Sequence, residues 1–337
     1  MRAATIATLY VLALVSVDAQ TGTKPQGQPA EASNAKAGTR TPATATSLKT
    51  PWGDPDLQGT WSNQTLTPLE RPREFADKPV LTEAEATAYE KRLVQQGNVD
   101  NRTPGTEQDV SLAYNQVWWD RGNKIVADRR TSLIVDPADG RVPQLTPAAQ
   151  KRRAEDRAAS AAEKNAASWL DFDVYSRCII RSALPRLSTG YNNNYEIVQS
   201  PGFVSILQEQ MHETRIIPLG NSPHLPSTVR QWLGDSRGHW DGNTLVVETT
   251  NFTDEGRGST FEYATRNMRL VERFTRISDR TIDYEFTVSD PETWTRPWTA
   301  KLPWNRIDGL IYEYACHEGN YGMEHMLSAA RAADAKK

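Results

Sequence analysis

Histidines beside glutamates are the residues of this chain best suited to chemistry. Five histidines occur in the sequence, and His212 and His317 each directly precede a glutamate. An imidazole oriented by a carboxylate can transfer protons near neutral pH. We therefore expect His317 to act as a general acid or base, with Glu318 or His212 as its partner. The alternative is structural: His317 and Glu318 would only bond to the backbone of nearby strands.

Large aromatic residues and arginines offer a place for a small molecule. Trp294, Arg296 and Trp298 occupy alternate positions of an expected strand, which would place them on one face. Rings on one face can line a pocket, and an arginine can clamp an anionic group of a ligand. Packing in the core is the alternative explanation for the tryptophans. The substrate-binding candidates are Tyr195, Asn194, Arg215, Arg296, Trp294 and Trp298.

Two other catalytic patterns can be weighed from their spacing. Residues 234–238 match the G-x-S-x-G elbow of serine hydrolases, which requires a helix after the serine. Residues 240–243 instead predict a hairpin, so we expect a glycine-bounded turn at 234–238. The H-E-x-x-H spacing of zinc proteases does not occur. We expect no cofactor; the alternative is a metal held by distant strands, for instance by His212, His239 and Glu248.

The chain has two cysteines, Cys178 and Cys316. In an exported protein two cysteines form a disulfide by default, and we expect one here, tying the segment before the sheet to the segment after it. The alternative is a nucleophilic Cys316 activated by His317. Side chains of sequence neighbours diverge on strands and helices, which argues against that dyad.

The elements that must position these residues are mostly strands. From residue 194 to about residue 314, runs rich in Val, Ile, Thr, Phe, Tyr and Trp alternate with polar turns. Consecutive strands without helical spacers predict a mainly β fold, an antiparallel meander closed into a lipocalin-like barrel or a sandwich. Such a fold can hold a small molecule in its mouth or interior. The expected strands are Asn194–Ser200, Phe203–Gln208, Glu213–Pro218, Thr244–Thr250, Met268–Ile277, Thr281–Val288 and Arg296–Leu302.

Helices are expected beside the sheet. A capping Thr82 predicts a helical insert near 82–96. A first-turn Pro147 predicts a second insert near 147–167, through an alanine-rich stretch. Residues 316–327 would form a C-terminal helix that plugs the end of the barrel.

The N-terminus indicates export. Arg2 precedes a short apolar run, Ala7–Val17, which small residues follow, as in a cleaved signal. We expect a signal peptide over 1–19, a disordered linker over 20–50 and a single β-rich domain over 51–331. The mature protein would be periplasmic or secreted, without a membrane anchor. A retained anchor is the alternative, although the apolar run is too short to span a bilayer.

The charge balance bears on the kind of partner. The formal net charge is −3, and acidic and basic residues are spread along the chain. No basic stripe dominates, so we expect no nucleic-acid partner. The basic run at 151–153 opens a helix that also carries acidic residues, which predicts a solvated face. A small-molecule ligand or substrate is the expected partner.

Four stretches of the chain carry a family resemblance: Pro51–Trp61, Asn194–Gln199, Gly234–Gly238 with Leu245–Thr250, and Tyr314–Gly322. Together they resemble a family of exported β-rich proteins of soil and aquatic bacteria. The resemblance covers nearly the whole region expected to fold, and it implies export and a β-rich fold but no particular catalytic residues. Position 239 in that family is more often arginine, which argues against an essential His239. The triplet Gly59–Trp61 also resembles the opening of lipocalin-like barrels.

Two functions are consistent with these residues. The first is a cofactor-independent enzyme that acts on a small organic molecule by general acid/base chemistry, as a lyase, isomerase or hydrolase. The alternative is a non-catalytic protein that binds an apolar or aromatic ligand with its tryptophans. A set of arginine, histidine and glutamate beside an apolar pocket favours the enzyme.

Overall fold

The computed structural model describes residues 48–107, 109, 115–162, 166–181, 184–253 and 264–335. The chain divides into two units, Met1–Thr44 and Ala45–Lys337, and all of the described residues belong to the second. The expected signal peptide, 1–19, lies outside the described residues. So does the expected linker, 20–50, except for its last three residues.

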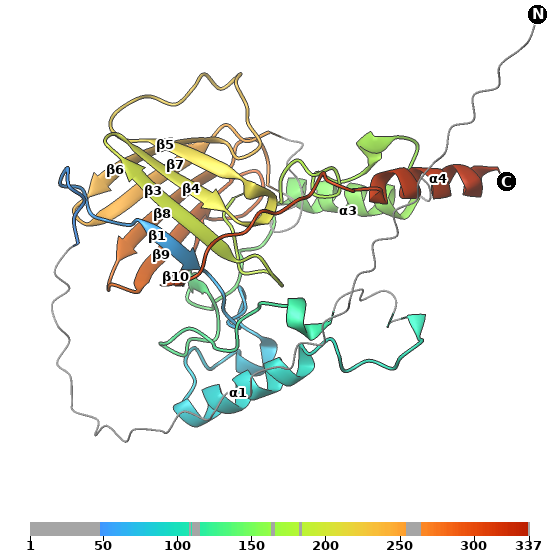
Figure 1. The fold of residues 1–337 in the computed structure, drawn as a ribbon, viewed down its shortest axis with the longest axis horizontal. Helices are drawn as coiled ribbons and strands as arrows, with labels where there is room; N and C mark the ends of the chain where they lie inside the picture. Colours follow the sequence, from blue (N-terminus) through green and yellow to red (C-terminus); the bar gives the residue numbers. More distant parts are fainter. Residues whose placement is uncertain are drawn as a thin grey trace, which may run out of the picture. The chain divides into compact units, whose positions relative to one another are not determined.

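A single sheet of ten strands forms the centre of this unit and curls into a nearly closed barrel (Figure 1). The strands are β1 (Gly59–Ser62), β2 (Ile134–Asp136), β3 (Asn194–Ser200), β4 (Phe203–Gln208), β5 (Thr214–Pro218), β6 (Asp235–Asp241), β7 (Thr244–Thr250), β8 (Arg269–Arg276), β9 (Thr281–Ser289) and β10 (Trp298–Arg306). Their order is β5-β4-β3-β1-β10-β9-β8-β7-β6, and β2 pairs with β10. A bridge between Leu219 and Gly238 joins the two ends of the sheet. The predicted fold, a mainly β antiparallel barrel, is confirmed.

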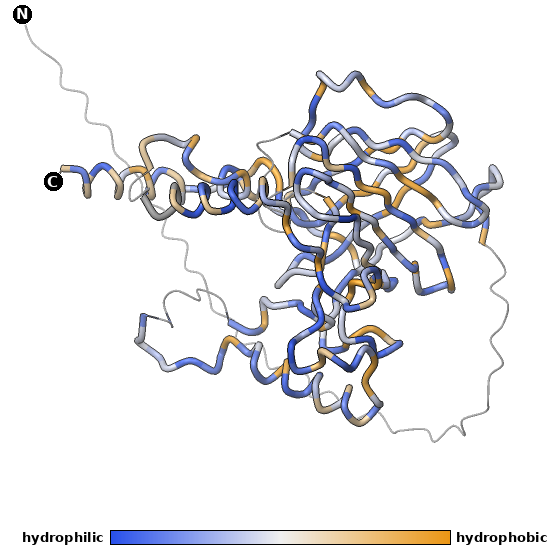
Figure 2. Tube along the Cα trace, turned by 180° about the vertical axis from the view of Figure 1, so that it is seen from behind, coloured by the Kyte–Doolittle hydropathy of each residue, from blue (hydrophilic) through white to orange (hydrophobic). Residues whose placement is uncertain are grey.

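Alternating burial explains why these segments form strands. In β9 and β10 nearly every second side chain is buried, and hydrophobic and hydrophilic residues alternate along the strands (Figure 2). A strand with this pattern turns one face toward a core and the other toward solvent. The predicted strands match the observed bounds closely, except that β10 begins two residues after the expected Arg296 and continues to Arg306.

The expected turn at 234–238 is wrong. Residues Asp235–Asp241 form β6, which pairs with β7 through a two-residue loop that begins at Gly242. The φ of Gly242 is +60°, as such a hairpin loop requires, and the predicted hairpin is confirmed. Ser236 is buried and its hydroxyl lies 2.9 Å from that of Thr249, so it is not presented as a nucleophile at a helix N-terminus.

Side chains fill the barrel. Fully buried rings such as Trp61, Phe274 and Trp298 belong to one hydrophobic cluster. A buried ion pair lies among them: Arg215 donates to both carboxylate oxygens of Glu272, at 2.6 and 3.1 Å. Among the described residues around this pair, the remaining cavity measures about 20 Å³, which is room for about one water molecule. The barrel interior is therefore not the place that admits a ligand, contrary to one of the two expectations.

The helices lie outside the sheet (Figure 1). They are α1 (Glu83–Gln96), α3 (Pro147–Ala162), α4 (Gly322–Asp334) and the short 3-10 helices η1 (Arg73–Phe75), η2 (Gln116–Trp118), η3 (Trp169–Asp171) and η4 (Gln210–His212). The predicted capping box of α1 is confirmed, since Thr82 accepts from the backbone of Glu85 and the Glu85 side chain accepts from the backbone of Thr82. The second predicted insert is confirmed as α3, which is described as far as Ala162.

The C-terminal helix does not plug the barrel. Ala330 is the buried residue of α4, whose other side chains are exposed or half-buried. Arg331 donates to the carbonyl oxygens of Ala166 and Ala167, which follow α3. The expected closure of the barrel by this segment is wrong.

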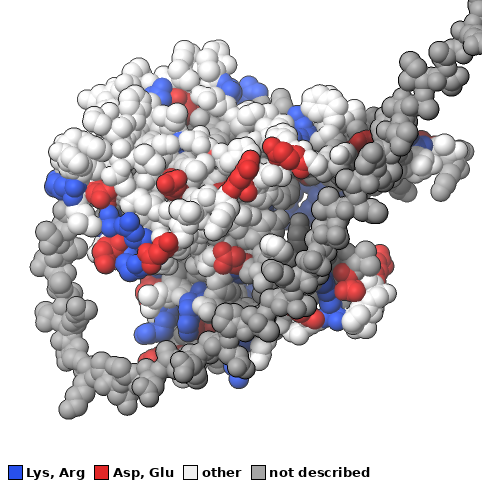
Figure 3. Space-filling model, viewed as in Figure 1, with Lys and Arg blue, Asp and Glu red and all other residues white. Residues whose placement is uncertain are grey.

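Charge and apolarity of the surface bear on partners. Acidic and basic residues are intermixed on the face shown in Figure 3. Within the part of the chain that the structure describes, no helix combines the length and the hydropathy needed to cross a membrane.

Candidate functional site

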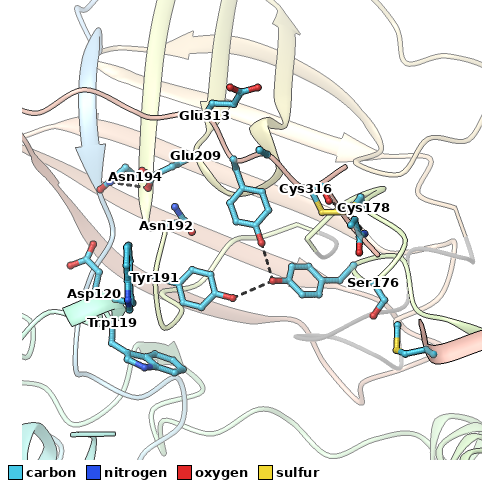
Figure 4. Close-up of a pocket in the computed structure, with 16 residues that line it drawn as sticks. Trp119, Asp120, Ser176, Cys178, Tyr191, Asn192, Asn194, Glu209, Glu313 and Cys316 are labelled. Atoms are coloured by element: carbon cyan, nitrogen blue, oxygen red, sulfur yellow. Dashed lines mark hydrogen bonds between the residues drawn. A yellow bond between two sulfur atoms is a disulfide. The ribbon is translucent and has the colours of Figure 1, made fainter. Parts of the chain in front are cut away.

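A cleft of about 690 Å³ opens at the rim of the barrel. It lies beside the start of β3 and the residue that follows β4 (Figure 4). Its other walls come from residues 118–120 at the end of η2, residues 175–178 after η3, residues 191 and 192 before β3, residues 313–320 before α4, and Met326 of α4. The cleft thus brings together parts of the chain that are far apart in sequence.

Glu209 is the most deeply buried carboxyl group of the cleft. It follows β4 directly and is 6% exposed. Asn194 Nδ2 donates to Glu209 Oε2 at 2.8 Å (Figure 4), and a side-chain hydrogen bond from Asn192 also lowers the pKa of Glu209. Burial raises the pKa of Glu209 by more than these hydrogen bonds lower it. This carboxyl group therefore exchanges its proton closer to neutral pH than an exposed glutamate does.

Asp120 is a second carboxyl group with a raised pKa. Burial raises this pKa, and a hydrogen bond from Gln64 lowers it less. The charge of Asp120 in turn raises the pKa of Glu209. The backbone fixes the residue, because Asp120 N donates to Gly190 O and Asp120 O accepts from Asn193 Nδ2, both at 2.7 Å. Two carboxyl groups in one cleft can divide the roles of acid and base, one protonated while the other is ionised.

Three tyrosine hydroxyls form a hydrogen-bonded chain along the cleft (Figure 4). The hydroxyl of Tyr175 lies at its centre, 3.2 Å from that of Tyr191 and 3.0 Å from that of Tyr314. Burial raises the pKa of Tyr175 and raises the pKa of Tyr191 to about 12. These two hydroxyls are therefore protonated at neutral pH and can either donate to a ligand or accept from it.

Trp119 depends on a close approach to the backbone. Its ring meets that of Tyr191 edge-on, with centroids 5.9 Å apart, and the Arg121 guanidinium lies 4.1 Å from its centre. A Cβ at position 190 would lie 2.3 Å from the Trp119 ring, so Gly190 is needed for this arrangement.

A disulfide holds the two outer walls of the cleft together. The predicted bond between Cys178 and Cys316 is confirmed. Tyr175 and Tyr314 lie within three residues of these cysteines in sequence. The disulfide therefore keeps the chain of hydroxyl groups assembled.

Unusual backbone geometry gathers around the cleft. Cys178 and Asn192 line it with φ values of +55° and +54°, and Met211 and His212, just after Glu209, have φ values of +66° and +42°. Positive φ is uncommon for residues other than glycine and concentrates at functional sites. The residues with positive φ thus lie in or next to the cleft, which supports its assignment as the functional site.

The cleft contains part of the predicted site. Asn194 lines it together with the two cysteines. His212 is exposed at its margin, with Nδ1 3.1 Å from the carbonyl oxygen of Tyr314. His212 therefore fastens the C-terminal segment through the backbone.

The expected acid/base pair is not assembled. His317 and Glu318 are exposed, and neither lines the cleft. The hydrogen bond described for the His212 ring goes to the carbonyl oxygen of Tyr314 and not to either of these residues. Sequence adjacency alone had grouped these side chains.

The remaining binding candidates belong to the interior or the surface of the barrel. Tyr195 stacks on Trp304 with centroids 4.3 Å apart, and Arg215 is held by Glu272. Trp294 and Trp298 lie in the hydrophobic core, as the packing alternative proposed. Arg296 precedes β10, is exposed, and pairs with Asp136 at 2.7 Å.

A metal site was the alternative to a cofactor-free protein. Within the described residues, no three or more His, Cys, Asp or Glu side chains gather so that they could hold a metal ion. His212, His239 and Glu248 therefore do not form such a group, and Glu248 pairs with Arg269 instead.

Sequence reasoning missed Glu209, Asp120 and the three tyrosines. One signal was present: Tyr175 precedes Cys178 by three residues and Tyr314 precedes Cys316 by two. A disulfide between these cysteines had to bring the two tyrosines close together. The carboxyl groups had no comparable signal, because their burial depends on the tertiary fold.

Comparison with known proteins gives no relative: no family model, no curated protein and no solved structure matches the chain. The cleft itself is therefore the basis for assigning a function. It combines buried and half-buried carboxyl groups, a chain of hydroxyl groups and aromatic walls, which can bind a small molecule and move protons on it.

Proposed function

We propose that the protein is an enzyme that binds a small organic molecule in the rim cleft and transforms it by general acid/base chemistry. Glu209 and Asp120 take the proton-transfer role that the sequence suggested for His317, Glu318 and His212. The single observation that carries this proposal is that two carboxyl groups, the deeply buried Glu209 and the half-buried Asp120, line one cleft and have pKa values raised by burial. Perturbed carboxyl groups in a cleft are a mark of catalytic sites.

The chemistry needs one group in each protonation state. The ionised carboxylate removes a proton from the bound molecule, and the protonated partner donates one elsewhere on it. Tyr175 and its neighbours orient the molecule through their hydroxyl groups. This division of roles suits a lyase, an isomerase or a hydrolase.

A second candidate is a binding protein without catalysis. It is favoured by the aromatic residues of the walls, which include Trp118, Trp119 and Tyr191. Rings of this kind hold ligands by contact area alone. The two candidates share the cleft and differ in what happens to the bound molecule.

We also infer that the protein acts outside the cytoplasm, in the periplasm or as a secreted protein. A disulfide and the absence of a membrane-spanning helix in the described segments are compatible with that location. The apolar run near the N-terminus and the resemblance to exported bacterial proteins support it further.

The first test identifies what the cleft retains. Wild-type protein is equilibrated with a pool of small metabolites, and the compounds that coelute with it are identified by mass spectrometry. A cleft ligand should be lost from Trp119→Leu protein, because that ring forms part of the wall. If every retained compound is held equally well by this variant, the cleft is not the site and both candidate functions fail.

The second test separates catalysis from binding. Each retained compound is incubated in excess over the protein in deuterated water. Acid/base catalysis predicts conversion or deuterium uptake, reduced in Glu209→Gln protein by about a hundredfold or more. Glu248→Gln, which alters a carboxylate paired with Arg269 outside the cleft, is the matched control and should keep full activity. A retained compound recovered unchanged and free of deuterium rejects the enzyme in favour of the binding protein.

A further inference from the structure

The charge of the cleft is of one sign. Its charged lining residues are Asp120, Glu209 and Glu313, and no lysine, arginine or histidine joins them among the described residues of the walls. Glu313 is exposed at the mouth, whereas Glu209 is deeply buried. A ligand that enters the cleft therefore meets acidic groups at both depths.

The two inner carboxyl groups are paired with amides rather than cations. Glu209 accepts from the side chains of Asn192 and Asn194, and Asp120 accepts from Gln64. Among the described residues that line the cleft, no lysine, arginine or histidine stands beside either group. Buried carboxylates are ordinarily paired with a cation, so the cleft has negative charge that the described residues leave uncompensated.

Two arginines next to the cleft are already stacked on its aromatic rings. Arg121 lies over the Trp119 ring, and Arg181 lies over the Tyr175 ring at 4.8 Å while its Nε donates to Gln210 Oε1 at 3.0 Å. Neither lines the cleft. His212, at the margin, uses Nδ1 on a backbone carbonyl.

The aromatic walls supply the other half of a cation site. Trp118 is 67% exposed at the cleft, and Tyr191 and Tyr314 face the same space. The face of an aromatic ring attracts a positive charge, and rings combined with carboxylates are how proteins recognise organic ammonium groups. The arginines already stacked on Trp119 and Tyr175 show the same attraction within this protein.

We propose that the ligand of the rim cleft is an organic cation, an ammonium group carried on an apolar or aromatic body. The ammonium group lies among Asp120, Glu209 and the tyrosine rings, and the apolar body lies against Trp118 and its neighbours. The proposal names the ligand class of the function proposed above and rests on the cleft being that site.

A matched pair of probes tests the charge alone. para-Hydroxyphenyltrimethylammonium and para-tert-butylphenol have nearly the same shape and differ by one positive charge. Titration calorimetry of the full protein at low salt should show the cation binding about tenfold tighter or better. The neutral probe binding as tightly as the cation overturns the proposal while leaving the cleft as a binding site.

Variants assign the preference to particular residues. Glu209→Gln and Asp120→Asn keep the shape of each side chain and should bring the ratio of the two affinities close to one. The neutral probe should bind these variants as it binds wild type. Glu248→Gln is the control for loss of an acidic residue outside the cleft, and it should keep the full ratio. A ratio that survives in the Glu209 and Asp120 variants also overturns the proposal.

Protons report on the same event. A cation favours the ionised form of carboxyl groups whose pKa is raised, so its binding should release protons near and below that pKa. The heat of binding measured in buffers of different ionisation enthalpy gives the number released. If neither probe binds, the ligand class is wrong, and the metabolite-pool experiment decides separately whether the cleft is the functional site.

Discussion

Glu209 and Asp120 differ from a surface carboxylate such as Glu248 in what sets their pKa. Burial is the leading cause for the first two, and it raises the pKa of each. Glu248 is bonded to Arg269, which lowers its pKa. The contribution of each kind of carboxyl group to the stability of the folded protein should therefore change with pH in opposite directions.

Replacing both cleft carboxyl groups should make the stability of the folded protein depend less on pH in the range above about 4. A group with a raised pKa contributes stability below its unfolded-state pKa and loses it as the pH rises through the folded-state pKa. Wild type should therefore lose more stability than the Glu209→Gln/Asp120→Asn double variant as the pH rises from about 4. Thermal unfolding over a pH series measures the difference.

The control for this prediction has the opposite sign. Glu248→Gln removes a group whose stabilising effect is present above its unfolded-state pKa and is lost as the pH falls. That variant should gain less stability than wild type as the pH rises through the acidic range. Parallel curves for wild type and the double variant would contradict the burial of the cleft carboxyl groups.

Gly190→Ala is expected to displace the Trp119 ring, which forms part of the cleft wall. The added methyl group would lie 2.3 Å from the Trp119 ring, so the ring must move. Overpacking of this kind costs about 1–3 kcal/mol, measurable by urea unfolding. Affinity for the ligand should fall with it. Gly309→Ala, where no atom lies within 4 Å of the new Cβ, is the control and should change neither. A Gly190→Ala protein with wild-type affinity would show that Trp119 is not part of the site.

At the scale of elements, the strands were the predictable part. β3, β4 and β7 have the bounds expected from their composition and turns, because each alternates between a buried and an exposed face. The segment 234–238 was misread because its two glycines suggest a turn, although pairing with β7 makes it a strand. Tertiary pairing overrides local preference at such positions.

The site was less predictable than the strands that hold it. Its walls come from segments around residues 118, 175, 192, 209 and 314, and nothing in the local sequence says that these meet. Only the two cysteines, through their expected disulfide, indicated that two of these segments meet. Trp298, by contrast, was a candidate binding residue. The sequence pattern of an aromatic residue on a strand is the same whether the ring faces a ligand or the core.

The disulfide predicts how firmly the outer wall is held. The Cys178→Ser/Cys316→Ser variant removes a link between residues separated by 138 positions. We expect the free energy of unfolding to fall by about 2–5 kcal/mol, and ligand affinity to fall because Tyr314 is released. Urea unfolding and ligand titration measure the two effects. Reduced wild type should match the variant, and an unchanged affinity would show that His212 alone suffices to fix the segment.

At the scale of the whole barrel, side chains fill the interior, so we assign the proposed function to the cleft at the rim. Glu272 accepts from Arg215 and from the hydroxyl of Tyr284, the latter at 2.8 Å, and so it is fully engaged. Removing one partner from such a buried pair leaves an uncompensated charge. The barrel interior is therefore a structural core that includes polar contacts. The chemistry proposed for the protein belongs to the cleft at the rim.

The order of the sheet predicts which truncations fold. A chain that ends after Asp290 lacks β10, which leaves β2 unpaired and β1 and β9 each without one of their two neighbours, so we expect no cooperative unfolding transition. A chain that ends after Asp308 keeps every strand and should fold but lose the cleft. Both should carry Cys178→Ser, and circular dichroism with urea unfolding measures the outcome. A folded chain that lacks β10 would contradict the observed strand order.

The pairing of β1 with β10 also sets when the molecule can be completed. Among the described residues, β1 is the first strand to be synthesised and β10 is the last, so β1 has to wait for β10 before the two can pair. Contacts between such distant segments form slowly. A nascent chain of this design therefore keeps its barrel open until β10 has been synthesised.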